Sequence, residues 1–213
     1  MKIIILGNGG HSKVIQEMVV SLKIHKIIAI LDEKIEFEKK ENGIIYAPFS
    51  AIKSLMAHDV KVVIAVGDNF ARKKIVKTLE LKDDQYISIF HPSSVISSSA
   101  IIGNGTVVMP KSVINAGAII GSHCIINTAS IVEHDNIVGN FSHVSPNSTL
   151  TGSVTLGEGV HIGASATLIP GIKIGEWSVI GAGSTVIQDI PSFSKAVGSP
   201  TRMINKDYEI KFS

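Results

Sequence analysis

A histidine lies between two carboxylates in the stretch Glu133-His134-Asp135. An imidazole takes up a proton near neutral pH, and a carboxylate hydrogen-bonded to one ring nitrogen orients the ring and raises its basicity. This combination suits a general base that removes a proton from an amine as the amine attacks a thioester. The residues alone fit a second interpretation equally well, in which His134 is an exposed histidine in an acidic surface pair. They also leave open whether Glu133 or Asp135 is its partner.

His134 lies inside a stretch, residues 96–186, in which every sixth residue is aliphatic. The period predicts a parallel β-helix of about five coils, each made of three hexapeptides, with the aliphatic side chains inside. Glycine often follows the aliphatic position, which suits a backbone that turns sharply there. An amphipathic helix would instead repeat every three or four residues. The aliphatic positions are Ile96, Ile102, Val108, Ile114, Ile120, Ile126, Val132, Val138, Val144, Leu150, Leu156, Ile162, Leu168, Ile174, Ile180 and Val186.

The eighteen-residue coil predicts which side chains stack on the histidine. Ala116 and Gly152 are one coil before and one coil after His134, and both are small, which leaves open volume beside the imidazole. Asn127, seven residues earlier, is a candidate to hydrogen-bond a substrate group.

The other histidines of the β-helix carry weaker signals. His143 has His161 stacked one coil beyond it. We expect His123 and His161 to be corner residues at the surface. No set of histidine, cysteine and carboxylate residues has metal-ligand spacing, so we predict no metal.

Composition and the lengths of the apolar runs argue against nucleic-acid-binding and membrane-spanning proteins. The 213 residues carry a formal net charge of +2, are 45% hydrophobic and 18% charged, and show no basic stripe, which argues against nucleic-acid binding. No apolar run is long enough to span a bilayer and no leader precedes the first strand, so we expect a cytoplasmic protein without a membrane partner. The single cysteine, Cys124, occupies a small-residue position of the β-helix and is expected to be buried.

The first part of the chain reads as a small Rossmann-like parallel α/β domain. Charged residues are common there and scarce beyond His91-Pro92, so we divide the chain into domains 1–91 and 92–213. The helix over 70–81 has a basic face that we expect to be solvated, formed by Arg72, Lys73, Lys74 and Lys77. The predicted strands are 2–6, 26–31, 60–66 and 86–90, and the predicted helices are 13–22, 49–57 and 70–81, with a charged loop over 34–42.

The ends of these strands converge at the carboxyl edge of the sheet, the usual ligand crevice of such domains. The glycine-rich turn after the first strand opens a helix, where backbone N–H groups favour an anionic phosphate. The dinucleotide fingerprint is incomplete because Ser12 replaces its last glycine. A tight turn without a ligand therefore remains an alternative, and an acidic residue at the second strand end fits a nicotinamide cofactor as well as another nucleotide. The candidate residues are Gly9, Gly10, His11, Asp32, Glu33 and Gly67.

The hexapeptide column resembles that of the left-handed β-helix acyltransferases. Over residues 2–203 the chain is similar to the PglD/NeuD-like family of bacterial nucleotide-aminosugar acetyltransferases. The motifs that carry the resemblance are Asn127-Thr, Glu133-His134-Asp135, Ser142-His143 and Ala196-Val-Gly-Ser-Pro200. It implies a left-handed β-helix, His134 as general base and Asp135 as the carboxylate that raises its basicity.

The resemblance also implies ligands and partners. Gly9, Gly10, His11, the Asp32-Glu33 pair and Gly67 match positions that hold the uridine diphosphate of a sugar. His143, Gly152, Ala164 and Ala182 match positions that contact acetyl-CoA. The implied reaction is N-acetylation of a UDP-amino sugar, UDP-4-amino-4,6-dideoxy-N-acetylglucosamine being the first candidate, by a homotrimer with acetyl-CoA between neighbouring chains. The alternatives are O-acetylation of sialic acid or another sugar, and a non-catalytic trimeric scaffold that binds a nucleotide.

Overall fold

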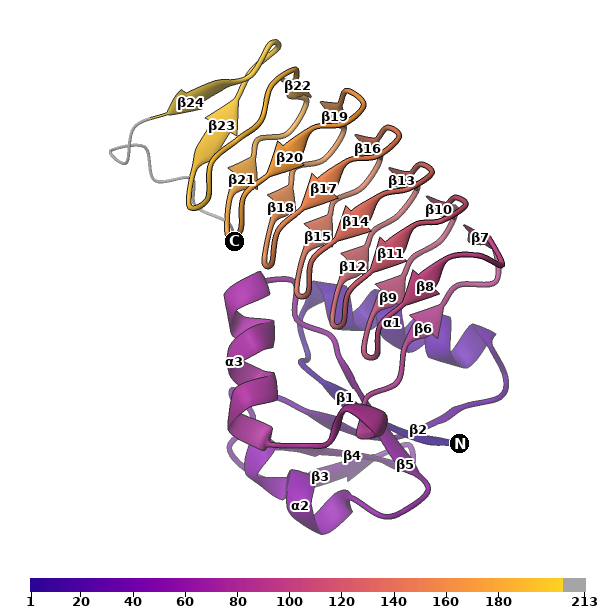
Figure 1. The fold of residues 1–213 in the computed structure, drawn as a ribbon. Helices are drawn as coiled ribbons and strands as arrows, with labels where there is room; N and C mark the ends of the chain where they lie inside the picture. Colours follow the sequence, from indigo (N-terminus) through magenta and orange to yellow (C-terminus); the bar gives the residue numbers. More distant parts are fainter. Residues whose placement is uncertain (205–213) are drawn as a thin grey trace.

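The computed structural model describes residues 1–204, and residues 205–213, the end of the predicted second domain, lie outside the described part. It contains a small α/β part and a long parallel β-helix (Figure 1). The fold class expected from the sequence is therefore confirmed.

The α/β part is built on one five-stranded sheet. Its order is β3-β4-β2-β1-β5, and all neighbours are parallel except β3 and β4. One face is covered by α1 (Gly10–Ser21) and the other by α2 (Ile52–Leu55) and α3 (Asn69–Leu79). The strands are β1 (Lys2–Leu6), β2 (Lys26–Leu31), β3 (Lys39–Glu41), β4 (Ile44–Ala47) and β5 (Val60–Ile64), and short 3₁₀ turns span Phe49–Ala51 and Asp83–Gln85.

Two segments differ from the sequence prediction. The charged loop expected over 34–42 contains β3, which forms a hairpin with β4 through Asn42 and Gly43, at φ 51° and 81°. Asn-Gly is the strongest short-range signal for such a turn, so this hairpin was visible in the sequence. The strand expected over 86–90 is divided between the two parts: Tyr86 forms a parallel bridge with Val62 of β5, whereas Ile89–Phe90 (β6) pairs with β9 of the β-helix.

The β-helix winds three parallel sheets around one aliphatic column. From β6 to β22, each strand pairs with the strand eighteen residues away, as Ile131 with Thr149, which confirms the coil length; the last coil is shorter, and Val179 pairs with Lys195. All the sixth-residue aliphatic side chains are buried except Ile96 and Ile102, which are partly buried at the first coil. The strands are β7 (Val95–Ile96), β8 (Ile101–Ile102), β9 (Val107–Val108), β10 (Val113–Ile114), β11 (Ile119–Ile120), β12 (Ile125–Ile126), β13 (Ile131–Val132), β14 (Ile137–Val138), β15 (His143–Val144), β16 (Thr149–Leu150), β17 (Thr155–Leu156), β18 (His161–Ile162), β19 (Thr167–Leu168), β20 (Lys173–Ile174), β21 (Val179–Ile180), β22 (Thr185–Val186), β23 (Lys195–Val197) and β24 (Arg202–Ile204).

Three rows of corners run along the coil, one at each edge where two of its sheets meet. The Asn127 corner is residues 127–130, between β12 and β13, together with the corners stacked on it. The His134 corner is residues 133–136, between β13 and β14, with those stacked on it. The docking corner is residues 121–124, 139–142, 157–160 and 175–178, which precede β12, β15, β18 and β21.

Every corner contains one residue in left-handed backbone, repeated each six residues from Gly105 to Gly183. The glycines that follow the aliphatic positions are different residues, and their φ angles are not positive. The expectation that they supply the turn is wrong. They are small because the coils approach closely: a Cβ on Gly139 would lie 2.5 Å from the carbonyl carbon of Gly157 in the next coil.

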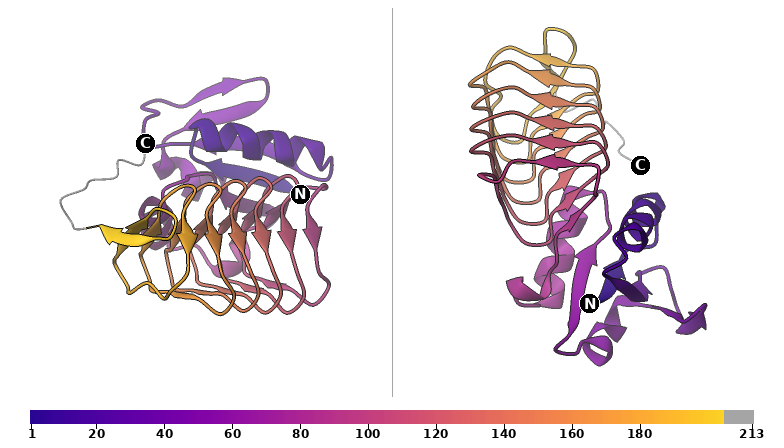
Figure 2. Two further views of the ribbon diagram at one scale, coloured as in Figure 1. Left: turned by 90° about the horizontal axis from the view of Figure 1, so that it is seen from above. Right: turned by 90° about the vertical axis from the view of Figure 1, so that its right-hand side faces the viewer.

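The two parts share a hydrophobic cluster. Outward-facing Ile89, Val107 and Met109 of the first coils pack with Ile15 and Val19 of α1. The α/β part therefore lies along one side of the stack of coils (Figure 2).

We predict that Gly139→Ala lowers the melting temperature by roughly 2–12 °C, since overpacking costs about 1–3 kcal/mol. Gly10→Ala is the matched control, because nothing lies within 4 Å of a Cβ built at Gly10. Thermal denaturation followed by circular dichroism measures both. Equal melting temperatures for the two variants would contradict the close-approach explanation.

Candidate active site

A cavity of about 890 Å³ lies between the α/β part and the β-helix. Five of the six candidates at the sheet edge line it, namely Gly9, Gly10, His11, Asp32 and Gly67. The opposite wall comes from strands β15, β18, β21 and β23 and from the docking corner, through His143, His161, Val179, Lys195, Gly159 and Trp177.

The α/β wall presents a helix N-terminus and a fixed carboxylate. Gly9 is the N-cap of α1 and has no side chain to occupy the free N–H groups of the first turn, which are therefore available to an anion. The two oxygens of Asp32 accept hydrogen bonds from the backbone N–H groups of Asn8 (2.7 Å) and Lys34 (2.9 Å). These bonds hold the carboxylate at the end of β2, beside the cavity.

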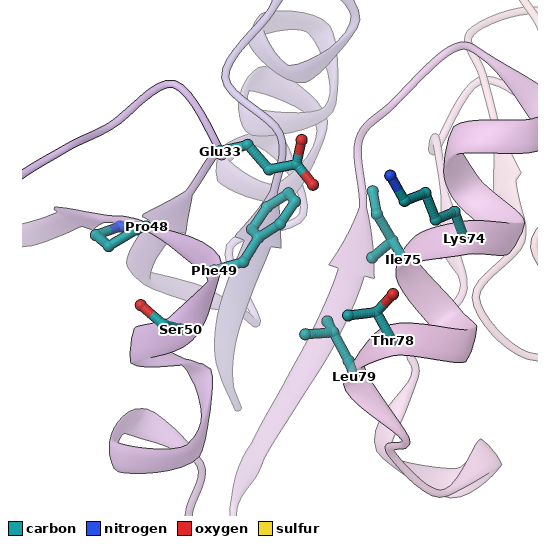
Figure 3. Close-up of a pocket in the computed structure, with 8 residues that line it drawn as sticks. All are labelled: Glu33, Pro48, Phe49, Ser50, Lys74, Ile75, Thr78 and Leu79. Carbon is teal, nitrogen blue, oxygen red and sulfur yellow. The ribbon is translucent and has the colours of Figure 1, made fainter.

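Glu33 does not line this cavity. It lines a separate hollow of about 290 Å³ with Phe49 and with Lys74 and Ile75 of α3 (Figure 3). Asp32 therefore lines the cavity and Glu33 lines the neighbouring hollow, on either side of the same turn. The expectation that all six candidates converge on one crevice is wrong for Glu33.

Two stacked histidines form part of the β-helix wall. Asn127 Nδ2 lies 2.9 Å from His143 Nε2, so the amide donates to the ring. His143 and His161 are one coil apart, with ring centroids 4.8 Å apart, and Ser145 Oγ lies 3.0 Å from His161 Nε2. His161 was expected at the surface and instead lines the cavity, because the α/β part covers this sheet.

The histidines of the cavity are neutral at neutral pH. Burial, and then the positive charge of Arg72, lower the pKa of His11 and of His161 to about 4. Burial, followed by the neighbouring His161, holds the pKa of His143 well below its usual value. A neutral imidazole can both donate and accept hydrogen bonds, so these rings can pair with hydroxyl groups of a ligand.

His123, the other histidine expected at the surface, is also buried, at 4% exposure. Its ring stacks on Phe141 and meets Tyr86 edge-on, with ring centroids 5.2 and 4.6 Å away. Burial lowers its pKa to about 4. It is part of the packing between the two parts of the molecule.

His134 lies on its own corner, away from the cavity. Its Nδ1 is 2.9 Å from Asp135 Oδ2, whereas Glu133 accepts a hydrogen bond from Asn115 Nδ2 at 2.9 Å. Asp135 occupies the left-handed position of the corner (φ 58°), which turns its carboxylate back towards the histidine. Of the two carboxylates, Asp135 is thus the partner in this structure.

Gly152 leaves room for the imidazole, as the coil spacing predicts. A Cβ at Gly152 would lie 2.6 Å from both Cε1 and Nε2 of His134. Any larger residue would displace the ring. The side chains of His134 and Asp135 are 60% and 67% exposed, so a ligand or a second chain can reach them.

The remaining candidates fall in a third place. Ala164 and Ala182 lie on the Asn127 corner, stacked through the hydrogen bond from Gly183 N to Ala164 O. Within one chain, the candidates are therefore divided among the cavity, the hollow that Glu33 lines, the Asn127 corner beside the cavity, and the His134 corner, which carries Gly152. Within residues 1–204, no three histidine, cysteine or carboxylate side chains gather closely enough to hold a metal ion. In the same residues, no helix has the length and hydropathy needed to cross a membrane.

We predict that the protein loses stability as the pH falls from about 6.5 to 4. The folded-state pKa values of His11, His123 and His161 lie near 4, so the unfolded chain binds more protons in this window. Denaturant unfolding at several pH values measures the loss. His123→Phe should reduce it by up to about 3 kcal/mol at pH 4, and exposed His58→Gln should leave it unchanged. Stability independent of pH in this window would contradict the burial of these rings.

Each of the two parts of the chain matches a known protein family. The family described as PglD N-terminal domain matches residues 2–79, and the family described as bacterial transferase hexapeptide (six repeats) matches residues 153–188. UDP-N-acetylbacillosamine N-acetyltransferase of Bacillus subtilis (strain 168) is 43% identical over 109 residues, which cover 49% of this chain and 50% of that protein. The match thus spans half of that relative's length.

Two solved structures match over nearly the whole chain. PerB from Caulobacter crescentus, in complex with CoA and GDP-perosamine, is 32% identical, with a TM-score of 0.87, and the match covers 96% of this chain and 98% of that one. The acetyltransferase domain of PglB from Neisseria gonorrhoeae, in complex with acetyl coenzyme A, is 31% identical, with a TM-score of 0.85 and coverage of 95% and 98%. The chain therefore belongs to the PglD-like family of hexapeptide-repeat sugar N-acetyltransferases.

Proposed function

We propose that this protein transfers the acetyl group of acetyl-CoA to the amine of a nucleotide-linked amino sugar, with His134 as general base. The main support is the geometry of one corner, where His134 is hydrogen-bonded to Asp135 and its ring lies over Gly152. Because Asp135 accepts from Nδ1–H, the other ring nitrogen, Nε2, carries the lone pair.

We also propose a cytoplasmic location, because acetyl-CoA is an intracellular metabolite.

The reaction needs one proton transfer. Acetyl-CoA supplies a thioester, whose carbon–sulfur bond breaks as the sugar nitrogen forms the new amide bond. Nε2 of His134 takes the proton that the nitrogen loses, and the coenzyme leaves as its thiolate. General-base help is worth roughly 100- to 10,000-fold.

The cavity and its neighbouring hollow fit a nucleotide diphosphate sugar. The free N–H groups at Gly9 and Gly10 suit the diphosphate, and Asp32 suits ribose hydroxyls. The hollow beside Glu33 and Phe49, just across the turn, suits the base. The neutral rings of His143 and His161 remain for the sugar; the resemblance matches His143 to an acetyl-CoA contact, but its place in this cavity favours the sugar instead. Residues 1–91 are then the nucleotide-sugar-binding domain and 92–213 the acetyltransferase domain.

UDP-4-amino-4,6-dideoxy-N-acetylglucosamine is the first substrate to try. The Bacillus subtilis relative is named for a UDP-linked sugar, whereas PerB was solved with GDP-perosamine. The relative named for the UDP-linked sugar has the higher sequence identity over its matched stretch, 43% against 32% for PerB, which favours UDP.

The site is completed by a second copy of the chain, in a homotrimer. Ile101, Ile119 and Ile137 stack one per coil on the sheet that follows the His134 corner, and they are 63%, 44% and 49% exposed. Such an apolar stripe favours association. A neighbour packed there would bring its Asn127 corner and cavity to His134, with acetyl-CoA between the chains along Gly152, Ala164 and Ala182.

We predict that CoA thiol is released from acetyl-CoA only when the UDP-amino sugar is present, and that His134→Ala lowers the rate by roughly 100- to 10,000-fold. His58→Ala, at an exposed histidine far along the sequence from the site, is the control. An acetyl group that survives mild alkali is an amide, and one that is lost is an ester, as O-acetylation would give.

Two other outcomes would change the proposal. Release that is unaffected by His134→Ala would remove this residue from the mechanism. No release with any amino sugar or with sialic acid would favour the non-catalytic scaffold.

A further inference from the structure

Arg72 is a fully buried cation to which the proposed chemistry assigns no part. Its place on the basic face of α3 predicts a solvated side chain, but it is only 1% exposed. Lys73, Lys74 and Lys77 on the same helix are exposed, as expected. Lys73 also reaches the β-helix, where its Nζ pairs with Glu158 and lies 5.0 Å from the centroid of the Trp177 ring, but its side chain stays exposed, whereas Arg72 is buried between the two parts.

The guanidinium of Arg72 donates to both parts of the molecule. On the α/β side, Nη1 lies 3.1 Å from Val66 O and 2.8 Å from Gly67 O, at the end of β5. On the β-helix side, Nε lies 3.0 Å from His123 O, and Nη2 lies 2.7 Å from Phe141 O and 3.4 Å from Ser142 O. All these acceptors are backbone carbonyl oxygens, and the three of the β-helix belong to the docking corner.

Carbonyl groups, and not a carboxylate, surround this charge. Within residues 1–204, no carboxylate lies within ion-pair distance of Arg72. Burial lowers its pKa to about 10, which leaves it protonated at neutral pH. A buried charge is costly unless its hydrogen bonds are satisfied, so the carbonyl groups are held to the fixed fork of the guanidinium. The ammonium group of a lysine is compact and its donors rotate freely, so it cannot reach the same carbonyl groups of both parts at once.

The groups that Arg72 joins are the two walls of the cavity. Gly67 lines the cavity from the α/β part, and His143, which follows Ser142, lines it from the β-helix. Asn69 adds a parallel link: it accepts from Arg72 Nη2 at 2.7 Å and donates to Gly159 O at 3.0 Å. Gly159 also lines the cavity.

We propose that Arg72 is a positioning residue, which sets the width of the nucleotide-sugar cavity by fixing the turn at Gly67 to the docking corner that immediately precedes His143. The inference rests on the proposed function, because it takes this cavity as the sugar-nucleotide site. Without the guanidinium of Arg72, the two walls of the cavity move apart, and a nucleotide sugar that contacts both walls binds more weakly. The His134 corner stays intact.

The test compares Arg72→Lys, which keeps the charge and removes the fork, with Lys77→Met, which removes a solvated charge from the same helix. We expect Arg72→Lys to raise the KM for the nucleotide sugar by about tenfold or more and the KM for acetyl-CoA by less than twofold. Lys77→Met should change neither. An unchanged sugar KM in a less stable Arg72→Lys protein would overturn the inference and leave Arg72 a stabiliser of the fold. Absence of turnover in the unaltered protein would instead count against the proposed function.

Hydrogen exchange of the unaltered protein tests the same link without a ligand and without a variant that must fold. If Arg72 joins the walls, the hydrogen-bonded amides of Ala65 and Arg72 and those of residues 141–143 open as one unit, with equal free energies of opening in low denaturant. Separate opening free energies for the two segments would overturn the inference.

Discussion

The backbone of the β-helix repeats every eighteen residues, and the positions of the proposed site residues follow from that constraint. Strands pair with their equivalents one coil away, so each side chain lies directly over the residue eighteen positions earlier. This stacking puts His161 on His143 and Gly152 against His134. It also forces one left-handed residue into each corner, and at the His134 corner that residue is the carboxylate partner, Asp135.

The α/β part converts one side of this stack into a binding cavity. Its sheet brings the N-terminus of α1 and the carboxylate of Asp32 to one edge, and α3 docks that edge onto the coil through Asn69, Phe70 and Arg72. Phe70 stacks on Trp177 with ring centroids 4.0 Å apart. Burial between the two parts then keeps the histidines of the cavity neutral. The cavity and the His134 corner remain separate in one chain, and in the proposed trimer a second copy bridges this separation.

The regular features of the fold were predictable because they depend on local spacing. The aliphatic column, the coil length and the space that Gly152 leaves beside His134 all follow from a period counted in the sequence. The hairpin at Asn42-Gly43 was also visible, as a turn signal. Successive residues of an extended strand end point to opposite sides, so the division of Asp32 and Glu33 between two hollows was accessible by the same reasoning.

The features that sequence reasoning missed arise where the two parts meet. Arg72 looks like its lysine neighbours in the sequence, and only the docked coil makes it a buried residue. His123 and His161 occupy corner or outward positions of a coil, which are exposed unless another part of the chain covers them. The partner of His134 was undecidable from spacing alone, because Glu133 and Asp135 are both adjacent to it. Backbone conformation decides between them.

The most direct test of the account is complementation between two inactive chains. One carries His134→Ala, and the other carries Gly10→Asp, which puts a negative charge at the N-terminus of α1 where the diphosphate would bind, at a position with nothing within 4 Å of a Cβ. If each site takes its cavity from one chain and His134 from another, random mixing of equal amounts restores about a quarter of the wild-type turnover. Turnover that stays at the level of the separate variants would contradict a site shared between chains.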